Sequence, residues 1–273
     1  MLEEIVQRVT AAFQGCRFLE AVVLGGSRAT GTATERSDLD IGLYYTPETI
    51  DYDCLNAIAQ RLDDSHRPDL ICRAGGWGPW VNCGGWLTID GTPVDLILRD
   101  MSRVEAVIEA TDLGQWACHY QSGHPHAFVD VMYRGELATC RVLYAKDAVF
   151  LAWKQRAAQY PPALQEAIAS FFLFEADFSC ALAEKYAASG DGYYLAGLIF
   201  RAVSALNQVC FARSGVWLLN EKKAVARVAQ LPVHPADYPQ RVARLFSRLG
   251  EHPQEAVALL RALCRETQTL CGG

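Results

Sequence analysis

Apolar positions follow two periods along this chain, and the change from one to the other divides it into two parts. In the first part, short apolar runs typical of strands alternate with segments of helical spacing. The predicted elements are helices at 2–14 and about 50–62, and strands at 18–24, 39–45, 70–72, 86–89 and 94–98. Asp90-Gly91 separates the last two strands and favours a tight hairpin turn.

Beyond about residue 145 the strand-like runs disappear. Long helices are predicted at 162–188 and about 193–213, with shorter helices to about residue 270. We therefore predict an α+β fold, in which residues 1–145 form a mixed β-sheet with helices on one side and residues 146–273 form an all-helical bundle domain. We expect a substrate cleft between these two domains, because domain boundaries commonly supply one.

Composition narrows the class of protein. Of the 273 residues, 51% are hydrophobic and 21% are charged, which excludes a largely disordered chain. The net charge of -6 argues against a protein that binds the phosphate backbone of nucleic acids. No signal peptide or membrane span is evident, so we expect a cytoplasmic protein without a membrane partner. The ten cysteines include no C-x-x-C pair, and most are expected to be free thiols.

Candidate chemistry lies between the first two strands. The first strand ends in Gly25-Gly26-Ser27, a turn whose backbone could approach a phosphate closely, with the Ser27 hydroxyl and Arg28 as further donors. Asp38 and Asp40 introduce the next strand, and because side chains alternate along a strand they share one face. Two carboxylates at this spacing suit hard divalent cations such as Mg²⁺.

A third acid, Asp95, lies between Val94 and Leu96 in a later predicted strand and could complete the metal-binding set. The order Gly26-Ser27, Asp38-Leu39-Asp40 and then Asp95 resembles that of the DNA polymerase beta-like nucleotidyltransferase superfamily. The longer run GGSRATGTATERSDLDIGL is similar to small bacterial nucleotidyltransferases of the antibiotic-modifying and toxin–antitoxin-linked kinds.

This resemblance implies a nucleotidyltransferase-type sheet, ATP or another nucleoside triphosphate as co-substrate, and two Mg²⁺ ions held by Asp38, Asp40 and Asp95. The expected reaction moves a nucleoside monophosphate, AMP from ATP, to a hydroxyl of a small molecule such as an aminoglycoside or lincosamide antibiotic. Two alternatives stay open: nucleotidylation of a protein or tRNA partner in a toxin–antitoxin-type system, and a nucleotide-binding module without turnover.

Several roles remain open at this stage. Asp95 is expected to be a metal ligand, the general base, or both, with Glu136 and Asp130 as the next candidates for the base. Lys154 is a candidate ligand for the triphosphate. The cluster of Cys118, His119, His124 and His126 suggests a loop at the mouth of the active site rather than a zinc site. Tryptophans 77, 80 and 86 either stack on a base or acceptor or cover the core.

Overall fold

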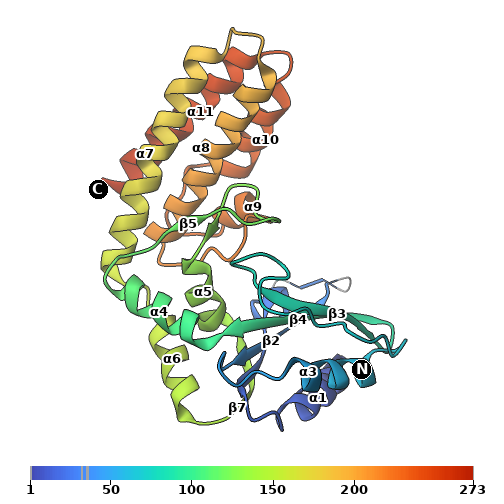
Figure 1. Cartoon of the computed structure of the whole chain (residues 1–273). Coiled ribbons are helices and arrows are strands. Elements are labelled where there is room, and N and C mark those ends of the chain that lie inside the picture. Colours follow the sequence, from blue (N-terminus) through green and yellow to red (C-terminus); the bar gives the residue numbers. More distant parts are fainter. Residues whose placement is uncertain (1, 32, 35–36, 273) are drawn as a thin grey trace. The chain divides into compact units, whose positions relative to one another are not determined.

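The computed structural model describes residues 2–31, 33–34 and 37–272. Thr32, Glu35 and Arg36 of the long nucleotidyltransferase-like run therefore lie outside the described residues. The chain divides into two compact units. The first contains most of residues 1–159, and the second contains residues 160–273 together with the short segments 111–115 and 124–126. Figure 1 shows a sheet with helices in the N-terminal part and long helices in the C-terminal part.

The first unit is built on a five-stranded mixed sheet in the order β3-β4-β2-β1-β7. Strands β2 and β4 run parallel, and the other neighbouring pairs are antiparallel. The sheet strands are β1 (Leu19–Leu24), β2 (Leu39–Tyr45), β3 (Cys83–Ile89), β4 (Thr92–Asp100) and β7 (Arg141–Ala145); β5 (Cys118–His119) and β6 (Phe128–Val129) form a separate pair. The helices are α1 (Leu2–Phe13), α2 (Gly26–Ala29), α3 (Tyr52–Leu62), α4 (Met101–Asp112), α5 (Val131–Thr139) and α6 (Ala148–Ala158). The mixed sheet of the predicted α+β fold is confirmed.

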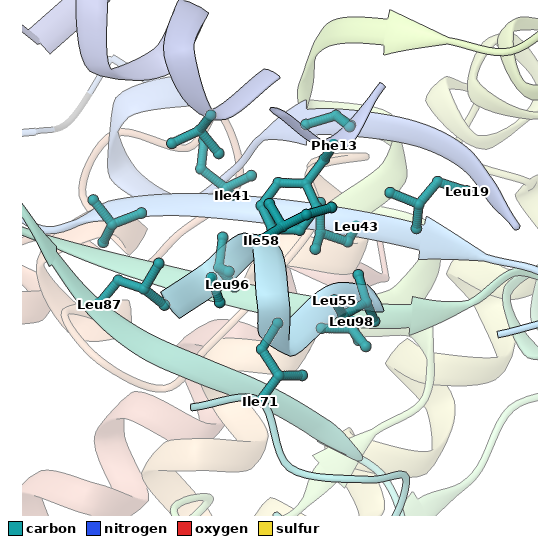
Figure 2. Packing of buried hydrophobic residues seen from close by; sticks show 14 of the residues in the cluster. Phe13, Leu19, Ile41, Leu43, Leu55, Ile58, Ile71, Leu87, Leu96 and Leu98 are labelled. Atoms are coloured by element: carbon teal, nitrogen blue, oxygen red, sulfur yellow. The ribbon is translucent and has the colours of Figure 1, made fainter. Parts of the chain in front are cut away.

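Helices cover both faces of this sheet, so the prediction of helices on one side is wrong. One face of β2 and β4 packs its alternate apolar residues, such as Ile41 and Leu96, against α1 and α3 (Figure 2). The opposite face contributes Val23 and Tyr44 to a second core with α4, α5 and α6. The alternation of a strand places neighbouring residues on opposite faces, and here both sets include large apolar side chains.

Two predicted strand boundaries differ from the structure. Residues 70–72 do not form a strand, because the Asn56 side chain bonds both backbone groups of Ile71. Ile71 N donates to Asn56 Oδ1 at 2.8 Å, and Asn56 Nδ2 donates to Ile71 O at 3.1 Å. Strand β3 begins at Cys83, inside the segment rich in Gly and Trp. Asn56, fifteen residues away in the sequence, thus makes the bonds that a strand partner would make to Ile71, while Cys72 N donates to Gly84 O of β3 at 3.0 Å.

Helix α6 lies in the first unit, whereas the predicted boundary at residue 145 placed it in the helical domain. Its Phe150 and Ala157 belong to the second core of that unit. The fully buried Arg134 of α5 also binds it, donating to the carbonyl oxygens of Arg156 at 3.0 Å and Gln159 at 2.9 Å.

The second unit is helical, as predicted. Its helices are α7 (Pro162–Tyr186), α8 (Gly192–Arg213), α9 (Ala224–Val228), α10 (Tyr238–Arg248) and α11 (Pro253–Cys271). Among the described residues, α8 alone is long and apolar enough to span a membrane by length and composition, and 78% of its apolar window is buried inside the protein. The central helix of a bundle has the same character.

Candidate functional site

Three side chains form a row across the sheet of the first unit. Asp40 of β2 is the register partner of Asp95 in β4, and Asp95 is the register partner of Trp86 in β3. Neighbouring strands lie about 4.8 Å apart, so the two carboxylates and the indole stand side by side. They point away from the face that packs on α1 and α3, because their chain neighbours Leu39 and Val94 belong to that core.

The electrostatics confirm that the acids share one region. Partial burial, followed by the negative charges of Asp40 and Asp38, raises the pKa of Asp95 to about 6. Asp38 lies one residue before β2 and is exposed. The three acids that the sequence pattern singled out are therefore brought close enough together to repel one another.

The glycine turn fits against Asp40. Gly25 N donates to Asp40 O at 2.8 Å, which fixes the end of β1 beside the start of β2. Gly26 has φ +57, and a Cβ placed on it would lie 2.6 Å from Asp40 Cγ and closer still to Oδ2. Glycine is therefore required at this position by its backbone angle and by the carboxylate packed against it.

Arg28 supports the loop that carries Asp38. Its Nε donates to Asp38 O at 3.1 Å, and its Nη2 donates to Ser37 O. The guanidinium therefore ties α2 to the start of β2. Ser27 lies within α2, next to Gly26. Phosphate binding by Gly26, Ser27 and Arg28 stays a prediction.

The side chain of Lys154 is hydrogen-bonded to the C-terminal end of α5. Its Nζ donates to Leu137 O at 3.1 Å and to Ala138 O at 2.7 Å, at the C-terminus of α5. A cation at this position stabilises the negative end of the helix dipole. Binding of a triphosphate by Lys154 would require these two hydrogen bonds to break.

The two alternative acids for the general base are both engaged in the fold. Glu136 accepts from the buried Arg99 at 2.6 Å and 2.9 Å, in a bidentate pair. Asp130 accepts from Ala117 N at 3.0 Å and lies 3.5 Å from His119 Nε2. Burial raises the pKa of Asp130. Asp95, in contrast, stands beside Asp40 on the neighbouring strand.

The three histidines of the predicted loop go to different partners. His119 stacks on Trp80 with ring centroids 3.5 Å apart. In the second unit, His124 Nδ1 lies 3.5 Å from Glu221 Oε2 and His126 Nε2 lies 3.3 Å from Glu175 Oε1. Within the part of the chain that the structure describes, no group of three or more His, Cys, Asp or Glu side chains is arranged to hold a metal ion. The histidines are thus distributed rather than gathered into a zinc site.

Asp38, Asp40 and Asp95 are among the described side chains that do not form such a metal-binding group in their present positions. The register pair Asp40 and Asp95 supplies carboxylate oxygens, which is the donor chemistry that Mg²⁺ prefers. Such a set fits a divalent cation whose remaining ligands come from water and from the phosphates of a nucleotide, as is usual for Mg²⁺.

Comparison with known proteins identifies the part of the chain that carries the turn and the first two acids. Residues 2–75 match the family model described as "Nucleotidyltransferase domain". This match supports the nucleotidyltransferase superfamily for the segment. The chain is also similar to a solved structure, a nucleotidyltransferase-like protein from Exiguobacterium sibiricum 255-15, with a TM-score of 0.47 and 8% identity over 99% of this chain and 78% of that chain. A comparison with curated proteins finds no significant match.

The match to the nucleotidyltransferase domain ends before Asp95 and Trp86. Asp95 is linked to the domain by its register with Asp40 and by the electrostatic effect of both acids on its pKa. Sequence reasoning did not connect Trp86 with Asp95. The hairpin at Asp90-Gly91 could have done so, because a two-residue turn fixes which residues of β3 and β4 face each other.

Proposed function

We propose that this chain transfers a nucleoside monophosphate, AMP from ATP, to a hydroxyl group of a small molecule such as an aminoglycoside or lincosamide antibiotic. The observation that carries the proposal is the pair Asp40 and Asp95, side by side in register and next to the Gly25–Ser27 turn of a nucleotidyltransferase domain. A binding module without turnover would have no need for three acids that repel one another.

In the proposed reaction, the acceptor oxygen forms a bond to the α-phosphorus of the nucleotide, and the bond between the α- and β-phosphates breaks. The electron pair of that bond leaves with pyrophosphate. Asp95 takes the proton of the acceptor hydroxyl, because Glu136 and Asp130 are engaged elsewhere. The backbone of Gly25 to Ser27 and the Ser27 hydroxyl would hold the phosphates.

Asp38 and Asp40, with Asp95 as a shared ligand, would hold Mg²⁺. When bound, the metal would neutralise the phosphate charges and stabilise the attacking and leaving oxygens. The residues of the chain then have the tasks of orienting the nucleotide, positioning the acceptor hydroxyl and accepting its proton. The chemistry depends more on positioning and charge than on a covalent intermediate.

Charge supports a small, cationic acceptor over a nucleic acid. The chain carries a net charge of -6, and the site itself contributes three carboxylates. Amino groups on an acceptor would be attracted to such a field. We also propose the cytoplasm as the compartment, since all ten cysteines are free thiols and a reducing environment keeps them so.

The proposal is tested by incubating the purified protein with Mg²⁺ and labelled ATP, GTP, CTP or UTP, each against aminoglycosides, lincosamides and cell lysate. We expect pyrophosphate release and a labelled small-molecule product with ATP. Asp40→Asn, which keeps the size of the side chain but removes its charge, should abolish both signals. Label that appears only on protein or RNA from the lysate would contradict the small-molecule acceptor, and equal release by Asp40→Asn would contradict the site.

A further inference from the structure

Trp86 is exposed in an unusual setting. The described residues include all six tryptophans, and Trp86 alone is largely exposed, at 60% of its surface. Its strand partner is Asp95. One ring face is covered by Trp77, which stacks on it with ring centroids 4.6 Å apart and an interplanar angle of 23°. A stacked indole that is still 60% exposed presents its other face to solvent.

Hydrogen bonds and close packing hold Trp77 in its position against Trp86. Trp77 N donates to Asn82 O at 2.9 Å, and Gln121 Nε2 donates to Trp77 O at 2.6 Å. The Trp77 ring lies over Gly84, where an added Cβ would overlap the ring and the Leu96 carbonyl. The irregular segment before β3 is thus fixed so that Trp77 backs Trp86. Rigid aromatic surfaces bind with a low loss of conformational entropy.

The order of the strands decides which substrate Trp86 faces. Along the sheet, the glycine turn at the end of β1 comes first, then Asp40 on β2, Asp95 on β4 and Trp86 on β3. In phosphoryl transfer the attacking and leaving oxygens lie roughly in line on opposite sides of the phosphorus. With the leaving pyrophosphate at the turn and the phosphorus at the acids, the acceptor enters from the side of Trp86.

We infer that Trp86, backed by Trp77, is the platform on which the acceptor docks, and that the acceptor is a polyhydroxylated ring such as a sugar. This inference rests on the proposed function. A sugar ring combines a flat face of C–H groups, which packs on an indole, with a rim of hydroxyl groups, one of which can reach the neighbouring Asp95. Amino groups on the ring would gain cation–π attraction to the indole. Trp86 is a positioning residue, and it takes no part in proton transfer.

The test uses the full-length protein and two ring-shaped probes, kanamycin and lincomycin. Binding of each is measured by calorimetry in the presence of Mg²⁺ and α,β-methylene-ATP, which cannot release pyrophosphate. We expect Trp86→Ala to weaken binding of at least one probe by about fivefold or more, the loss typical of an aromatic anchor. Trp86→Phe should retain most of the affinity. The matched control is Tyr193→Ala, which removes an aromatic side chain that is 92% exposed in the other unit.

Affinity for α,β-methylene-ATP should be unchanged in all three variants. A loss of nucleotide affinity in Trp86→Ala, with sugar binding intact, would assign the platform to the base and overturn the inference. So would equal sugar affinity in Trp86→Ala and wild type, or no binding of either probe to wild type. Binding that depends on Trp86 in a protein that never releases pyrophosphate from ATP would refute the proposed function while the platform stands.

Discussion

The contact between Gly26 and Asp40 makes Gly26→Ala a sharp test of the site. The new methyl group would lie 2.6 Å from Asp40 Cγ, whereas ordinary contacts begin at 3.4 Å. The carboxylate must therefore move by roughly 1 Å, a misplacement that can cost about 100-fold in rate. The φ of +57 adds strain of about 1–2 kcal/mol for a residue with a Cβ.

Gly91→Ala separates these two effects. Gly91 has φ +72 and nothing within 4 Å of an added Cβ, so its substitution imposes the backbone strain without the collision. We expect both variants to lower the melting temperature by a few degrees, since about 1 kcal/mol corresponds to roughly 2–4 °C in a protein of this size. Gly26→Ala alone should lose about 100-fold in pyrophosphate release and should bind Mg²⁺ more weakly.

The assays are thermal unfolding followed by circular dichroism, pyrophosphate release under saturating ATP, and calorimetric titration with Mg²⁺. Wild-type pyrophosphate release by Gly26→Ala would refute the close fit between the turn and Asp40. A loss of activity in Gly91→Ala as large as in Gly26→Ala would show that strain, rather than displacement of the carboxylate, causes the effect.

Three further outcomes follow from the contacts described above. Asp95→Asn should lower the rate about 10²–10⁴-fold if Asp95 is the general base; partial recovery at high Mg²⁺ would show a ligand role instead, and a normal rate would remove Asp95 from the site. Lys154→Met removes two hydrogen bonds to α5 and should lower the free energy of unfolding in urea titrations by about 1–3 kcal/mol. The KM for ATP should change less than threefold, and a larger change would place Lys154 at the triphosphate. Hydrogen bonds from Arg67 lower the pKa of the buried Asp63 well below its ordinary value of 3.8, so its contribution to stability is fully present above about pH 4 and is lost progressively as the pH falls from there through the lowered pKa. The difference in melting temperature between wild type and Asp63→Asn should therefore begin to shrink below about pH 4 and continue to shrink to about pH 2, and a difference that stays constant over this range would contradict the pairing.

Much of the first unit follows from local pattern. Alternation of apolar residues in β2 and β4 placed Leu39 and Leu96 in the core and Asp40 and Asp95 on the opposite face. The Asp90-Gly91 turn formed as its residue types require, with φ +51 and +72. These features depend on a few neighbouring residues, which is why the sequence was sufficient.

The boundaries that failed depend on residues far apart in the sequence. Residues 70–72 have a strand-like composition, but Asn56, fifteen positions away from Ile71, takes the hydrogen bonds that a strand partner would make. The environment of a candidate general base also depends on residues that are distant in the sequence. Glu136 was a candidate for the general base, but it pairs with Arg99, thirty-seven residues away in the chain.

The sequence by itself determined the first two strands of the sheet, the long helices of the second unit, the glycine turn and the spacing that puts Asp38 and Asp40 together, since these rest on backbone preferences and on the periodicity of apolar residues. Only the tertiary structure decided that β4 lies parallel to β2, which brings Asp95 beside Asp40. The same sheet order carries Trp86 to the far side of Asp95 from the turn. The contact between α6 and α5, also tertiary, places Lys154 at the C-terminus of α5. Pairing between strands is settled by long-range burial of the whole sheet, and no local pattern encodes it.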